Sequence, residues 1–233
     1  MIRQLIRIRR KRVLIDVDTQ RDFLVSSGNA CVRNHRRVLA NIRRVMAWAR
    51  SKNVRIISTA EVHPDDGSNG QVNYCLEGSE GQKKVSYTLM GNRAQFIADG
   101  STDLPVNVLW DYQQVILEKR CTDPFAEPRI ERLLTEIKPD EFIVVGSSTD
   151  GAVKAMVLGL LQRGNHVSIV VDAIGSQDKK ASEMAIRQMQ AKGAKLIETK
   201  KLAGSSHLYM VGACGCERCR GLMRKSPVGA ASD

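Results

Sequence analysis

The sequence predicts an α/β fold, a Rossmann-like three-layer sandwich with a six-stranded, mainly parallel sheet. Short runs of β-branched and apolar residues alternate along the chain with longer amphipathic stretches, which is the pattern of parallel strands joined by crossover helices. A chain of 233 residues is also long enough to bury one substantial core. We therefore expect one central domain at residues 12–204, between a basic arm at 1–11 and a cysteine-rich tail at 205–233.

Six strands and four helices follow from the hydrophobic pattern. The predicted strands are residues 12–18, 54–59, 115–119, 142–145, 167–171 and 195–198. The predicted helices are residues 35–52, 127–137, 150–163 and 179–192. In the first helix the apolar residues recur at the spacing of one helical face, and Gly164 and Gly193 close the last two. Residues 63–110 show no clear period, so we expect a long loop that carries function or acts as a lid.

The composition is that of a soluble globular protein. Apolar residues make up 42% and charged residues 26% of the chain, and the longest apolar runs are far shorter than the roughly 20 residues of a membrane-spanning helix. The opening stretch lacks the apolar core of a secretory signal, and half of the six cysteines sit together in the tail. We therefore expect a cytoplasmic protein with free or metal-bound thiols and no membrane partner.

Positive charge is concentrated near the start of the chain. Residues 1–50 hold thirteen Lys and Arg against three Asp, which accounts for ten of the eleven net positive charges. Such a basic arm is able to contact nucleic acid or an acidic partner. The alternative is a solvated or subunit-binding extension.

Polar residues stand directly after several predicted strands, where parallel α/β sheets bind ligands. The first strand leads into Asp18-Thr19-Gln20-Arg21-Asp22-Phe23, and the predicted strand at 115–119 ends in Lys119. The strand at 142–145 leads into Gly146-Ser147-Ser148-Thr149-Asp150-Gly151-Ala152-Val153, which opens a helix.

In order and spacing, these segments resemble the isochorismatase-like cysteine hydrolases, the family of nicotinamidases and isochorismatases, over roughly residues 12–204. Asp18 matches the aspartate of a D-x-Q-x-D-F motif, and Lys119 stands six residues before Phe125, as the family lysine does before its phenylalanine. Ala152 takes the place of the nucleophilic cysteine in G-x-x-T-D-x-C-V.

The resemblance implies hydrolysis of a small amide or vinyl ether. The family aspartate takes the thiol proton, the thiolate attacks, and the lysine steadies the developing charge. Backbone N–H groups near Ser148 and Ala152 would form an oxyanion hole. The other residues expected to line the pocket are Gln20, Phe23, Ser147, Ser148 and Gly151.

Ala152 removes the nucleophile, and such a loss costs on the order of a millionfold in rate. Three explanations stay open at this point: the chain keeps the pocket without the chemistry, the cysteine was replaced deliberately to trap a ligand, or another residue took over. Gly151 is a second departure from the family pattern, which favours a natural change. Cys121, two residues beyond Lys119, is the displaced nucleophile to consider, although it is equally well explained as a small buried residue.

Two groups of residues raise the question of a metal. Glu61 and His63 match a metal-binding pair of the nicotinamidases, but Tyr74 stands where the later histidine would be, so we expect no metal in the pocket. In the tail, Cys214, Cys216 and Cys219 with His207 offer a Cys₃His set for zinc. The alternative is a flexible, reduced tail.

The leading hypothesis is an isochorismatase-like protein without cysteine-hydrolase activity that acts by binding a small-molecule ligand or a partner and forms a homo-oligomer. The alternatives are a hydrolase of small amides with a displaced nucleophile, and binding of nucleic acid or an acidic partner by the arm and tail. Asp18 and Lys119 do not decide between them, because a buried ion pair also persists when each charge merely neutralises the other.

Overall fold

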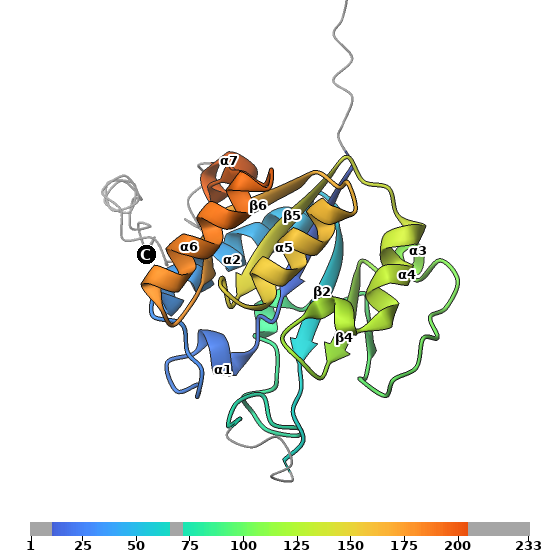
Figure 1. Ribbon diagram of the computed structural model, residues 1–233. Helices are drawn as coiled ribbons and strands as arrows, with labels where there is room; N and C mark the ends of the chain where they lie inside the picture. Colours follow the sequence, from blue (N-terminus) through green and yellow to red (C-terminus); the bar gives the residue numbers. More distant parts are fainter. Residues whose placement is uncertain (1–10, 66–71, 205–233) are drawn as a thin grey trace, which may run out of the picture.

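The computed structural model describes residues 11–65 and 72–204, and it contains one seven-stranded sheet in which every strand pair is parallel (Figure 1). The order across the sheet is β3-β4-β2-β1-β5-β6-β7. The strands are β1 (Arg12–Val17), β2 (Arg55–Glu61), β3 (Arg93–Phe96), β4 (Gln114–Lys119), β5 (Glu141–Ser147), β6 (Val167–Gly175) and β7 (Lys195–Ile197). The predicted α/β class and parallel sheet are confirmed.

The expected count of six strands is wrong, because β3 is a seventh. It lies at the edge of the sheet, pairs with β4 alone, and falls inside the stretch that shows no period in the sequence. Its four side chains are exposed or half-buried in alternation, so it contributes no apolar run that a sequence pattern could detect. β3 is a strand because it hydrogen-bonds to β4, and its own sequence gives no sign of this pairing.

The four predicted helices are present with ends that differ by one or two residues. They are α2 (His35–Ser51), α4 (Pro128–Glu136), α5 (Ala152–Gln162) and α6 (Lys179–Ala191). Short additional helices are α1 (Arg21–Leu24), α3 (Val108–Asp111) and α7 (Thr199–Ala203), with 3₁₀ turns η1 (Ser86–Thr88) and η2 (Pro124–Ala126). The short helices are too brief to show a helical period.

Helices cover both faces of the sheet and create two apolar cores (Figure 1). Successive strand side chains point to opposite faces, so Val13 and Ile15 pack on the side of α5 and α6, whereas Leu14 packs on the side of α2. Helix α5 contacts β1, β5 and β6, and α2 contacts β5, β6 and α7. This arrangement holds the carboxyl ends of β1, β4 and β5 together at the lower edge in Figure 1.

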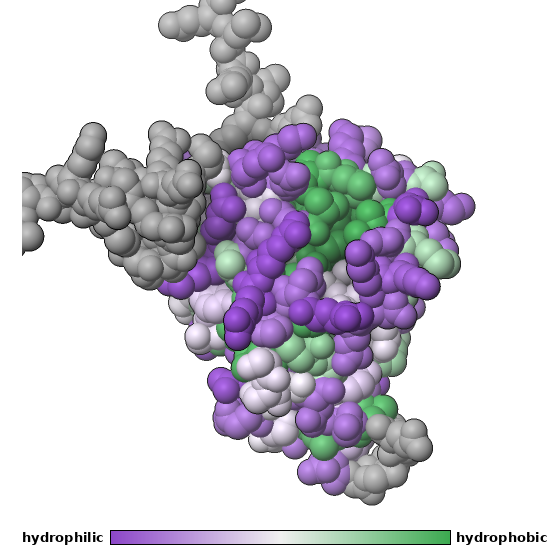
Figure 2. All heavy atoms as spheres, turned by 90° about the vertical axis from the view of Figure 1, so that its left-hand side faces the viewer, coloured by the Kyte–Doolittle hydropathy of each residue, from purple (hydrophilic) through white to green (hydrophobic). Residues whose placement is uncertain are grey.

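The surface is mixed in character. Within the described residues, no helix combines the length and apolar character needed to cross a membrane. Figure 2 shows one largely hydrophilic face with an apolar area near its top that hydrophilic side chains surround. Protein chains commonly associate through exposed apolar areas. The homo-oligomer stays a prediction, and this area is a candidate for its interface.

Candidate functional site

The candidate site lies where the chain direction across the sheet reverses. The chain proceeds from β1 to β2 on one side and returns to β5 on the other, so β1 and β5 are neighbours whose connections diverge. Such a switch point leaves a crevice at the carboxyl ends of the strands. Asp18 follows β1 there, and Ser148 follows β5 and leads into α5. A cis peptide bond joins Ser147 to Ser148, and Ser147 Oγ donates to the Asp18 carbonyl oxygen at 2.9 Å.

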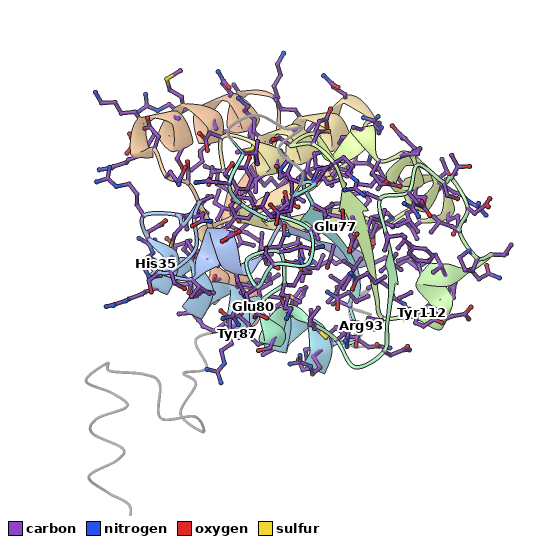
Figure 3. The ribbon with its side chains drawn as sticks, turned by 90° about the horizontal axis from the view of Figure 1, so that it is seen from below. His35, Glu77, Glu80, Tyr87, Arg93 and Tyr112 are labelled. Atoms are coloured by element: carbon purple, nitrogen blue, oxygen red, sulfur yellow. The ribbon has the colours of Figure 1, made fainter. Side chains whose placement is uncertain are left out.

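Residues 72–85, between β2 and β3, lie at this end of the sheet and are called the covering segment. Residues 81–85 run beside residues 19–22, and the N–H groups of Arg21, Asp22 and Val85 donate to carbonyl oxygens across the two segments. Figure 3 shows this end from below, with Glu77 and Glu80 on the covering segment. Within the stretch that shows no sequence period, residues 81–85 therefore lie against the segment that follows β1. A function or lid role for the stretch stays a prediction.

A buried charge cluster occupies the crevice. Lys119 Nζ lies 2.8 Å from Asp18 Oδ2 and 2.8 Å from Glu61 Oε2, and none of the three side chains is more than 3% exposed. Lys119 also donates to the Cys121 carbonyl oxygen at 2.8 Å. One ammonium thus serves two carboxylates, and the structure brings together the Asp18 and Lys119 that the sequence singled out.

Neighbouring strands orient the cluster. Glu61 and Lys119 are partners in the register of β2 and β4, so their side chains leave the sheet side by side. Thr59 Oγ1 donates to Asp18 Oδ1 at 2.6 Å, and the Asp18 N–H donates to the Thr59 carbonyl oxygen at 3.2 Å. Asp18 itself has a left-handed φ of 43°, a backbone conformation that such contacts on both sides must hold in place.

The protonation preferences follow from two carboxylates around one cation. Burial raises the pKa of Asp18, and burial together with the neighbouring charge of Glu61 outweighs the lowering of that pKa by Lys119. Burial also works against ionised Glu61, but the ion pair with Lys119 and the hydrogen bond to His63 lower its pKa overall. Although burial lowers the pKa of Lys119, the two carboxylates raise it above the ordinary value. Glu61 and Lys119 are therefore the stable ion pair, and Asp18 is the carboxyl that takes up a proton most readily.

The residues that resemble a metal pair do not fit a metal ion. Glu61 Oε1 lies 2.8 Å from His63 Nε2 and 3.4 Å from the Tyr74 hydroxyl, while Glu61 Oε2 is held by Lys119. Both carboxylate oxygens are thus engaged, and the ammonium beside them would repel a cation. No group of three His, Cys, Asp or Glu side chains within residues 11–65 and 72–204 is arranged to hold a metal.

Ala152 is buried at the first position of α5, at 1% exposure. The Ser148 carbonyl oxygen accepts hydrogen bonds from the N–H groups of Gly151 and Val153. The N–H of Ala152, at the start of the helix, has no carbonyl one turn earlier inside the helix to accept it. Its role as an oxyanion donor stays a prediction. The methyl side chain carries no nucleophile.

Two expected pocket residues have structural partners. Gln20 Nε2 donates to the carbonyl oxygens of Glu61 and Gln82, and Gln20 Oε1 accepts from the Glu61 N–H, so this amide joins β2 to the covering segment. The Phe23 ring is buried with its centroid 5.4 Å from that of Tyr74. Their contact with a ligand stays a prediction.

The two cysteines near the site differ in exposure. Cys121 is exposed, and its thiol donates to the Asp123 carbonyl oxygen at 3.5 Å. Cys75 is fully buried, and burial together with the nearby carboxylates raises the pKa of its thiol. The expected zinc ligands His207, Cys214, Cys216 and Cys219 lie outside the described residues, as does the arm before Lys11.

Sequence reasoning missed two contributors. Thr59 ends a predicted strand, and only strand pairing shows that its hydroxyl reaches Asp18. Lys84 lies on the covering segment and forms a second buried ion pair with Asp16 Oδ2 at 3.0 Å. Nothing in the sequence around Lys84 indicates that it is buried. Asp16 does give a signal, because a charged residue inside an apolar strand needs a partner of opposite charge.

Comparison with known proteins places these features in context. Residues 12–201 match the family model of the isochorismatase domain. The comparison with curated proteins found no match. Similar solved structures include nicotinamidase PncA from Bacillus subtilis, with 18% identity, a TM-score of 0.64, and coverage of 81% of this chain and 99% of that one.

Two further structures carry ligands according to their descriptions. The pyrazinamidase of Pyrococcus horikoshii in complex with zinc is 21% identical, with a TM-score of 0.64 and coverage of 81% of this chain and 99% of that one. PnC1 from L. infantum in complex with nicotinate is 19% identical, with a TM-score of 0.62 and coverage of 82% and 93%. At these identities the similarity shows the shared fold.

Proposed function

Because this chain belongs to the isochorismatase domain family over residues 12–201, we propose that it binds a small polar ligand at the carboxyl end of its sheet and lacks cysteine-hydrolase activity. The observation that carries this proposal is Ala152, at the start of α5, where the family resemblance puts the nucleophilic cysteine. A methyl group has no lone pair with which to attack a carbonyl carbon.

The buried charges support ligand recognition over a purely structural role. For stability alone, one carboxylate would suffice to neutralise Lys119, and a second buried carboxylate costs free energy. The raised pKa of Asp18 reflects that cost. Asp18 is able to accept a hydrogen bond from an amide N–H when ionised, and the Ala152 N–H is able to donate to a carbonyl oxygen. A neutral amide offers both groups, so we propose a small amide as the ligand class.

The test compares the unaltered protein with two variants in an ammonia-release assay with nicotinamide. We expect no turnover by the unaltered protein and measurable turnover by Ala152→Cys. Ala152→Ser is the control, because serine is similar in size to cysteine but lacks the thiol, and we expect it to show no turnover. Binding of nicotinamide by the unaltered protein is measured separately by calorimetry, with Asp18→Ala as the comparison. Turnover by the unaltered protein that Asp18→Ala abolishes would overturn the inactive interpretation.

The same assay examines the displaced nucleophile. If turnover by the unaltered protein depends on Cys121, the Cys121→Ala variant loses it while Cys75→Ala keeps it. We expect neither variant to differ from the unaltered protein, because the Cys121 thiol is exposed and hydrogen-bonds to Asp123.

A further inference from the structure

A large cavity lies at the amino ends of the strands, at the opposite end of the sheet from the charge cluster. Its volume is about 840 Å³, within the range of about 300–1,000 Å³ that is typical of ligand pockets. It is formed where β1 and β2 begin and where α4 leads into β5. We call it the amino-end cavity and define it by Arg12, Trp48, Arg55, Trp110, Ile137 and Lys138.

Both tryptophans of the chain line the amino-end cavity. Trp48 lies on α2 and Trp110 on α3, and the chain contains no other tryptophan. The Trp110 side chain is 62% exposed, a large apolar area to leave in water. Lys11 Nζ lies 5.9 Å from the centroid of the Trp110 ring. A planar aromatic group is the kind of ligand that stacks on such a ring.

The lining is also strongly cationic. It includes five basic residues and a single acidic one, Glu136. The basic residues are Lys11, Arg12, Lys52, Arg55 and Lys138. Arg12 is neutralised by Glu141, with Nε 3.0 Å from Oε2, and Glu136 pairs with Arg132. With five basic side chains and one acidic side chain, the lining carries a net positive charge, which favours an anionic ligand.

Arg55 connects the aromatic and cationic parts. Its guanidinium donates to the carbonyl oxygens of Trp110 and Tyr112, at 3.1 Å and 3.3 Å, and so fixes the backbone under the exposed indole. Both acceptors are uncharged carbonyl groups, so these two hydrogen bonds do not neutralise the guanidinium. A guanidinium has five N–H donors, and those not used by the two carbonyl groups suit phosphate oxygens.

We propose that the amino-end cavity binds a nucleoside phosphate. The base stacks on tryptophan, and the phosphate is held by Arg55 and Lys138. A doubly charged phosphate matches several cations better than a single carboxylate does. This site is separate from the ligand site proposed at the carboxyl end, so either can fail without the other.

Intrinsic tryptophan fluorescence reads this site directly, since both fluorophores line the cavity. Titration with AMP is expected to give a saturable change that adenosine and inorganic phosphate reproduce only at concentrations at least tenfold higher. Arg55→Gln and Lys138→Gln should each weaken AMP binding about tenfold, the loss expected for one charge-assisted hydrogen bond. Lys138 is exposed, so its variant tests the site even if Arg55→Gln impairs folding. Asp18→Asn, at the opposite end of the sheet, should leave AMP binding unchanged.

Four outcomes would overturn the proposal. The first is that AMP gives no saturable fluorescence change, and the second is that inorganic phosphate or benzoate binds with the same affinity as AMP. The third is that Lys138→Gln binds AMP as tightly as the unaltered protein does. The fourth is that a single-stranded oligonucleotide binds while AMP does not. The last would assign the cavity to a nucleic acid instead.

Discussion

Lys119 Nζ lies 2.8 Å from Asp18 Oδ2, and each of the two side chains is 1% exposed. Because Glu61 lies at the same distance from the same ammonium, the cluster holds more negative than positive charge when both carboxyl groups are ionised. The stability of this end of the sheet therefore depends far more on the cation than on either carboxylate.

Replacing Lys119 by methionine should lower the free energy of unfolding by about 3–5 kcal/mol, because two buried carboxylates lose the ammonium that they share. Asp18→Asn is the matched control. It leaves the pair of Lys119 with Glu61 intact and removes the carboxyl whose charge burial disfavours, so it should cost clearly less. Urea denaturation at pH 7 measures both variants, and equal losses would contradict this account.

Stability should fall as the pH rises above about 10. Burial lowers the pKa of Lys119, but the two carboxylates raise it above its usual 10.5. The stability that the charged Lys119 contributes is therefore complete below pH 10.5 and is lost as the pH rises through the pKa of the folded state. Burial raises the pKa of Tyr74 to about 12, so its contribution is complete below 10 and is lost on ionisation near 12. Thermal melting between pH 8 and 11.5 checks this, and Tyr74→Phe should flatten part of the decline. A melting temperature that is constant over this range would exclude it.

The thiols should differ sharply in their reaction with iodoacetamide in the native state. Cys121 is exposed and should be alkylated first. Cys75 is buried, and burial raises the pKa of its thiol, so little reactive thiolate is reachable until the chain unfolds. Peptide mapping by mass spectrometry after timed labelling distinguishes the two sites. Labelling of Cys75 at the rate of Cys121 would show that the covering segment opens readily.

Gly146 should not tolerate alanine. Its φ is 125°, and an added Cβ would overlap the Val17 carbonyl oxygen on the neighbouring strand. Strain and overlap together should cost roughly 3 kcal/mol or more. Gly164→Ala is the matched control, because Gly164 has a φ of 75° with nothing near the added carbon, so that it isolates the cost of backbone strain at about 1 kcal/mol. Chemical denaturation of both variants measures the difference, and equal losses would mean that the overlap relaxes freely.

How much of the site the sequence predicts depends on whether a residue's role is local. Asp18 stands directly after β1, and Ala152 opens the helix that follows β5, so the alternation of strands and helices is enough to place both at the carboxyl end of the sheet. From the sequence, Glu61 is identifiable only as half of a metal-binding pair. Its contact with Lys119 depends on how β2 pairs with β4, two segments that are separated by more than fifty residues.

The sequence by itself determined the parallel α/β class, the two motifs at the switch point, and the absence of a thiol at position 152, because hydrophobic periodicity and residue identity are local properties. Only the tertiary structure decided that β3 joins the sheet, that Glu61 shares the Lys119 ammonium, and that both tryptophans line one cationic cavity. These relationships arise from the register and packing of distant segments, which no local pattern of residues encodes.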